Sequence, residues 1–102
     1  MMTSLEAIAF KIISSAGSGK SKAFMALTEA KKGNFEEAGN LLEEAKKSIG
    51  EAHEVHREIL TNMANGEQIN YDFLMVHAED HLMNTILAKE LIEELIEVYK
   101  TK

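Results

Sequence analysis

His77 and His81 are the side chains of this 102-residue sequence best placed to do chemistry, because they stand four positions apart with Asp80 beside them. On a helix, residues four apart lie one turn apart on the same face, so the two imidazoles would be neighbours. A neutral imidazole nitrogen can take up a phosphoryl group as a nucleophile, and a neighbouring imidazole can donate a hydrogen bond to the added oxygens. The spacing is therefore compatible with phosphoryl transfer through a histidine.

Zinc binding is the alternative use of the same residues. Two histidines and one carboxylate on a single helix rarely complete the tetrahedral coordination that zinc prefers. The metalloprotease motif would also require glutamate at the position of Ala78. Zinc therefore stays an alternative, as a site shared within an oligomer.

Two other groups of residues have functional interpretations that the sequence supports less well. His53 and His56 stand three positions apart on a predicted helix, where packing or hydrogen bonding is the expected role. Residues 16–21, Ala-Gly-Ser-Gly-Lys-Ser, end like a phosphate-binding loop. Ser14, however, occupies the position of the first glycine of that motif, and no predicted strand precedes it. Nucleotide binding is therefore not expected.

The composition predicts an all-α protein. The sequence has no proline, cysteine or tryptophan, which is typical of long helices with short connections. Without cysteine there are no disulfides, no thiolate metal ligands and no thiol nucleophile. Eleven basic residues against seventeen acidic ones give a net charge of −6. This charge opposes binding to nucleic acids and to anionic lipid surfaces.

The length favours a single domain, residues 1–102, because a chain of this size cannot bury two independent cores. No apolar run approaches the roughly 20 residues of a membrane span. Residues 1–6 lack the basic start and the cleavage site of a secretory signal. We therefore expect a cytoplasmic protein without membrane insertion.

The first predicted helix begins at a capping box formed by Thr3 and Glu6, and Gly33 is its expected end. The spacing of small and apolar residues continues through Gly17 and Gly19, so the helix should not stop there. Two glycines this close predict a bend or a close backbone approach. The expected packing face comprises Ala9, Ile12, Ala16, Gly19, Ala23, Ala26 and Ala30.

The second predicted helix begins at Asn34, its expected cap, and ends at a break over residues 64–68. A third helix should run over about residues 70–99. Three long helices with short breaks predict an antiparallel three-helix bundle. The expected seam of the second helix comprises Phe35, Ala38, Leu42, Ala45, Ile49, Ala52, His56, Ile59 and Met63.

The third predicted helix has apolar residues on two faces, and a three-helix bundle can bury one of them. One face holds Leu82, Ile86, Ile92 and Ile96. The residues of the other face are spaced as in a coiled coil, so we expect them to pack against other copies of the chain, with dimer and trimer left open. This second face comprises Phe73, His77, Asp80, Asn84, Leu87, Leu91, Glu94 and Val98.

Polar residues interrupt that second face at His77, Asp80 and Asn84. If copies of Asp80 meet around an axis, their charges must be relieved by protonation or by a divalent cation. Alternatively, the seam frays at this end and water solvates the polar side chains. A non-catalytic coiled-coil adaptor, in which these residues set the register, is thus a second functional hypothesis.

Residues 76–83, Val-His-Ala-Glu-Asp-His-Leu-Met, closely resemble the enzyme IIA component of the lactose/cellobiose phosphotransferase system. The resemblance extends to Glu51-Ala52-His53, to residues 91–97 and to residues 32–35 at the first break. It covers nearly the whole chain.

This resemblance implies a set of roles. His77 matches the histidine that accepts a phosphoryl group from the phosphocarrier HPr and passes it to a cysteine of the IIB component. Asp80 matches the aspartate that meets its copies in a homotrimer around a divalent metal, commonly Mg²⁺, and His81 matches a second histidine with a supporting role. The family serves uptake of β-linked disaccharides such as lactose, cellobiose or diacetylchitobiose.

Three residues depart from the pattern of the family. Glu79 stands where glutamine is usual, and His56 and Arg57 stand where glutamine and threonine are usual. A carboxylate near a phosphohistidine would repel the phosphoryl dianion unless it faces away or binds a cation. In addition, a His77 enclosed in the oligomer seam could not meet HPr, so either the seam opens into a groove between subunits at that end or the coiled-coil spacing assigned to this face is slightly wrong there.

Overall fold

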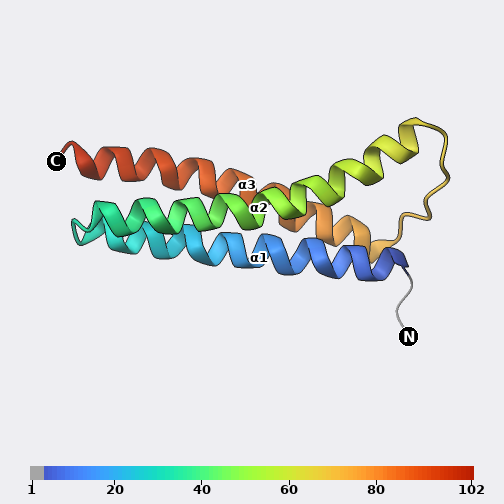
Figure 1. The fold of residues 1–102 in the computed structure, drawn as a ribbon, viewed down its shortest axis with the longest axis horizontal. Coiled ribbons are helices and arrows are strands. Elements are labelled where there is room, and N and C mark those ends of the chain that lie inside the picture. The colour runs from blue at the N-terminus through green and yellow to red at the C-terminus, as the bar shows by residue number, and fades with distance from the viewer. Residues whose placement is uncertain (1–3) are drawn as a thin grey trace.

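The computed structural model describes residues 4–102, which form three long helices in antiparallel order (Figure 1). Helix α1 spans Ser4–Lys31, α2 spans Phe35–Ala64 and α3 spans Phe73–Lys100. The bundle is elongated, with principal extents of 51 × 28 × 19 Å. The predicted all-α three-helix bundle is confirmed. No helix within residues 4–102 is long and apolar enough to cross a membrane.

The predicted capping box at the start of α1 involves Thr3, which lies outside the described residues, so it stays a prediction. The end of α1 agrees with the prediction: Gly33 has a φ of +85°, the left-handed conformation that favours glycine. The amide of Gly33 donates to the carbonyl of Ala30, and the amide of Asn34 donates to the carbonyl of Glu29. These bonds satisfy two of the last four carbonyls of the helix.

Asn34 occupies the N-cap position of α2, but the prediction that its side chain caps this helix is wrong. Its backbone, with φ −87° and ψ 68°, is outside the extended region that capping side chains prefer. The side-chain amide instead donates to Oε2 of Glu29 over 2.8 Å. This hydrogen bond, helped by nearby Lys32, holds the pKa of the Glu29 carboxyl below its usual value.

The second connection is longer than predicted. It covers residues 65–72, with Gly66 at a φ of +94°. Helix α3 begins at Phe73 rather than near Asn70, because Asp72 is its N-cap and accepts a hydrogen bond from the amide of Met75 over 3.0 Å. The aspartate satisfies a donor of the first turn and so fixes where the helix starts.

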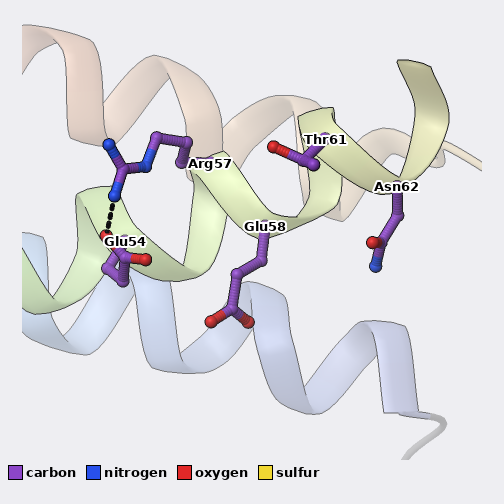
Figure 2. A pocket seen from close by; sticks show the side chains of 5 residues that line it. All are labelled: Glu54, Arg57, Glu58, Thr61 and Asn62. Carbon is purple, nitrogen blue, oxygen red and sulfur yellow. Dashed lines mark hydrogen bonds and ion pairs between the residues drawn. The ribbon is translucent and has the colours of Figure 1, made fainter. Parts of the chain in front are cut away.

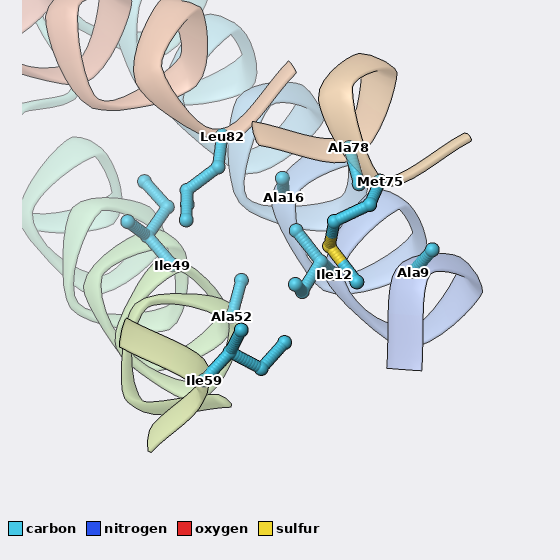
Figure 3. Packing of buried hydrophobic residues seen from close by; sticks show 9 residues of the cluster. All are labelled: Ala9, Ile12, Ala16, Ile49, Ala52, Ile59, Met75, Ala78 and Leu82. Carbon is cyan, nitrogen blue, oxygen red and sulfur yellow. The ribbon is translucent and has the colours of Figure 1, made fainter. Parts of the chain in front are cut away.

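The core consists of two clusters between the three helices. All seven residues of the expected α1 packing face are buried. In α2 six of the nine predicted seam residues are buried, Phe35 and Leu42 are half-buried, and Met63 is exposed near the end of the helix. Leu41 is buried although it was not predicted. Figure 3 shows side chains of all three helices converging on the first cluster. That cluster comprises Ala9, Ile12, Ala16, Ile49, Ala52, Ile59, Met75, Ala78 and Leu82.

Gly19 marks a close approach of α1 and α2, one of the two consequences expected of the glycine pair. A Cβ built on Gly19 would lie 2.5 Å from Cγ1 of Ile49 and 3.2 Å from the carbonyl oxygen of Ala45. Helix α1 continues through both glycines. The absent side chain therefore lets the two helices pack closely.

We expect Gly19→Ala to lower the free energy of unfolding by about 1–2 kcal/mol, although alanine favours helix, because overpacking a tight contact outweighs the gain in propensity. Gly39→Ala is the matched control, since a Cβ on Gly39 meets nothing within 4 Å. The control should raise stability by about 0.5–1 kcal/mol. Urea unfolding at one protein concentration measures both. Stabilisation by Gly19→Ala would contradict the close approach.

Candidate active site

His77 and His81 lie on the same side of α3, one turn apart. Their ring centroids are 6.3 Å apart and the ring planes are tilted by 60°. His77 is exposed and His81 is half-buried. An accessible imidazole with a second imidazole beside it is an arrangement in which one ring can be modified and the other can contact the added group.

Helix α1 approaches the histidine pair at Gly17. A Cβ built on Gly17 would lie 3.9 Å from Nε2 of His81. The backbone of α1 therefore borders the pair without a side chain in between. The sequence singled out the two glycines as a backbone feature, but it did not place either one beside a histidine.

Asp80 is exposed on α3 and accepts a weak hydrogen bond of 3.4 Å from the amide of Asn84. Within residues 4–102, no group of three His, Cys, Asp or Glu side chains could hold a metal ion. Asp80, His77 and His81 therefore do not form such a group in the single chain.

The second apolar face of α3 is exposed in the single chain. Phe73 has 86% of its surface accessible, Leu87 and Leu91 each have 56%, and Val98 has 55%. The expectation that the three-helix bundle leaves this face uncovered is confirmed.

Glu79 points toward α2 and is held there by two neighbours. Its Oε2 lies 2.5 Å from Nε2 of His56, a buried residue of α2 with 7% exposure. The Tyr71 hydroxyl donates to the same oxygen over 2.7 Å. Burial, reinforced by the contact with Glu79, raises the pKa of Tyr71 to about 12, so the hydroxyl keeps its proton and remains a donor at neutral pH.

The family model described as the lactose/cellobiose-specific IIA subunit of the phosphotransferase system matches residues 7–100. The chain belongs to this IIA family. Members are phosphoryl carriers, so the chain is a phosphotransferase-system component of sugar transport.

The relatives and solved structures described here match this chain along almost its full length. The lactose-specific EIIA component of Staphylococcus epidermidis is 42% identical over 96 residues, covering 94% of this chain and 92% of the relative. The crystal structure of the cellobiose-specific enzyme IIA from Bacillus anthracis superposes with a TM-score of 0.94 at 42% identity, covering 99% of this chain and 93% of that one. Two solution structures of an IIA(Chitobiose)–HPr complex, one named as that of Escherichia coli, give TM-scores of 0.87 and 0.78 at 32% identity, covering 98% of this chain and 97% of each neighbour.

The three departures from the usual IIA pattern take different places in the structure. His56 and Glu79 contact each other, so this carboxylate faces α2. Arg57 is exposed and pairs with Glu54 over 2.6 Å. The interpretation of His56 as a hydrogen-bonding residue is confirmed. Arg57, in contrast, forms its ion pair with a residue of its own helix.

A shallow hollow on α2 contains Arg57 but neither histidine of the pair. Its lining comes from one exposed stretch of α2, as Figure 2 shows. It is thus separate from the candidate active site of this IIA component. The lining residues are Glu54, Arg57, Glu58, Thr61 and Asn62.

The Gly-Lys-Ser sequence at residues 19–21 lies inside continuous helix. A phosphate-binding loop needs a curved backbone whose amides point at the phosphates, and an uninterrupted helix uses its amides internally. The expectation against a nucleotide-binding loop is confirmed.

Proposed function

We propose that His77 is the phosphoryl acceptor of this IIA component. Phospho-HPr is the donor, and the cysteine of a IIB component is the acceptor during uptake of a β-linked disaccharide. The observation that carries the proposal is an exposed His77 ring beside His81 on α3 of a IIA-family chain. The solved complexes of a chitobiose IIA with HPr support HPr as the donor.

In the first step, a ring nitrogen of His77 attacks the phosphorus of phospho-HPr. One N–P bond forms on His77 while the bond between phosphorus and HPr breaks, and its electron pair stays with HPr. In the second step, the IIB thiolate attacks the same phosphorus: an S–P bond forms, the N–P bond to His77 breaks, and its electron pair returns to the imidazole. Both steps depend mainly on positioning and on stabilising the charge of the phosphoryl oxygens.

His81 is the residue we assign to that stabilisation. It stands one turn after His77, and an N–H of its ring can donate to the phosphoryl oxygens. Glu79 does not oppose this role, because its carboxylate is hydrogen-bonded on the α2 side of the helix.

The proposal includes a homotrimer formed through the second face of α3, with Asp80 of each chain at the axis. An exposed carboxylate suits this place, because Mg²⁺ prefers oxygen ligands and each copy would add one carboxylate. Such an ion, when bound, offsets the repulsion among the Asp80 side chains. The assembly must leave His77 open to HPr, and this requires the seam to widen between subunits at that end.

The decisive experiment is intact mass measurement after incubation with phosphoenolpyruvate, enzyme I and HPr. We expect a gain of one phosphoryl group per chain that depends on HPr and is lost in acid, as expected of a phosphohistidine. No gain under conditions where HPr itself becomes phosphorylated would overturn the proposal and favour the adaptor interpretation. Stoichiometric zinc in the purified protein would instead favour the zinc site.

A further inference from the structure

We propose that His56 and Tyr71 are positioning residues for phosphoryl transfer: by fixing the Glu79 carboxylate against α2, they set the rotation of the first turns of α3 and so the direction of the His77 ring. The inference rests on the proposed function, because it takes His77 as the acceptor. Neither His56 nor Tyr71 contacts the reacting atoms in this account; both act through Glu79.

The geometry brings three separate segments to one oxygen atom. His56 belongs to α2, Tyr71 to the connection before α3, and Glu79 to α3 itself. Both contacts are on Oε2, at 2.5 Å from the imidazole and 2.7 Å from the hydroxyl. Two contacts from different directions fix the side chain of Glu79 and, through it, the helix that carries it.

The first turns of α3 need such a restraint because other anchors there are weakly directional. The preceding residues 65–72 are outside any helix, and Phe73 and Val76 at the start of α3 are largely exposed. Met75 and Ala78 are buried, but a flexible thioether and a single methyl tolerate small rotations of the helix. Hydrogen bonds to a partly buried carboxylate are more sensitive to direction.

One polar side-chain contact joins α2 to this part of α3. Within residues 4–102, the other polar side-chain contact between these helices is the ion pair of Lys46 with Glu93, at 3.5 Å and further along α3. The first apolar cluster also packs the two helices together. Loss of the His56 contact would thus remove the directional contact between α2 and the His77 end of α3 and leave the apolar packing in place.

The contacts of His56 and Tyr71 also fix the position of the negative charge of Glu79. Glu79 stands two residues before His81 and two after His77, and its side chain is 27% exposed. A carboxylate without its partners would turn toward solvent, where it repels an incoming phosphoryl dianion. His56 and Tyr71 therefore hold both the helix and the negative charge in place.

The test is the rate of phosphoryl transfer from phospho-HPr, measured by rapid quench over a range of phospho-HPr concentrations. We expect His56→Ala to lower the maximal rate about tenfold with the half-saturating concentration unchanged, because a small misplacement of the acceptor slows the reaction step. His56→Gln, whose amide can still donate to Glu79, should stay within about twofold of the wild type. The control is His53→Ala, an exposed residue of the same helix, which should leave the rate unchanged.

A second readout separates positioning from mere loss of stability. The ¹H–¹³C signals of the His77 ring should shift in His56→Ala and in Tyr71→Phe, and keep their positions in His53→Ala. Should His56→Ala fail to fold, Tyr71→Phe removes one donor without a large cavity and is expected to slow transfer about threefold.

The two proposals fail differently. If the wild type gains no phosphoryl group, the proposed function is wrong. If the wild type is phosphorylated while folded His56→Ala and Tyr71→Phe react at the wild-type rate, the positioning inference alone is overturned. Equal slowing by His56→Ala and His56→Gln would overturn it as well, because the retained hydrogen bond should rescue the rate.

Discussion

Replacement of His77 by glutamine is expected to abolish phosphorylation by phospho-HPr. Glutamine is a good helix former and His77 is exposed, so the variant should fold like the wild type. Its amide nitrogen is not a nucleophile, and the phosphoryl group therefore has no acceptor. Intact mass after incubation with phosphoenolpyruvate, enzyme I and HPr should show one phosphoryl group on the wild type and none on His77→Gln.

Two further variants test whether the effect is specific to the histidine pair of α3. His81→Ala removes the imidazole beside the acceptor together with its N–H donor and should slow transfer about 10²-fold, as expected for loss of one donor to a developing charge. His53→Gln alters an exposed histidine of α2 and should become phosphorylated at the wild-type rate. A phosphoryl group that persists on His77→Gln would show that another residue is the acceptor.

The combined substitutions Leu87→Asp and Leu91→Asp are expected to convert the proposed trimer into monomers. Each leucine has 56% of its surface accessible in the single chain. Each contributes about 2 kcal/mol when buried between subunits, and a carboxylate in that seam would cost more. Light scattering coupled to gel filtration should give a molar mass of three chains for the wild type and one for the variant.

Asp80→Leu is the matched control on the same face of α3. It removes the crowded carboxylates and adds an apolar side chain, so the trimer should remain while bound metal, measured by elemental analysis, disappears. Complete dissociation of this variant would contradict the role given to Asp80. A wild type that is monomeric at every concentration would contradict the whole interface.

The helices were predictable because their signals are local. Small residues every three or four positions define the buried side of α1, and Gly33 ends the helix in a conformation that other residues avoid. The start of α3 was placed too early, at about residue 70, because Asp72, which caps the helix in the structure, was not recognised as its N-cap. Helix ends depend on which polar side chain meets the free amides, and the spacing of apolar residues does not fix that.

The candidate site was predictable where it depends on one helix and not where it depends on three segments. The spacing of His77 and His81 is enough to make them neighbours. The contact between His56 and Glu79 joins residues far apart in the sequence, and it depends on the crossing of α2 and α3. No sequence pattern pointed to Tyr71, because the position of its side chain depends on the path of the second connection.

The unequal connections bear on the order in which the chain folds. Residues 32–34 join α1 to α2 through a tight turn, whereas residues 65–72 form a longer link to α3. Closing a short loop costs less conformational entropy, and local contacts form fastest. We expect the α1–α2 hairpin to form first and α3 to dock onto it. The histidine pair would then acquire its surroundings, Gly17 on one side and the anchored Glu79 on the other, in the last step of folding.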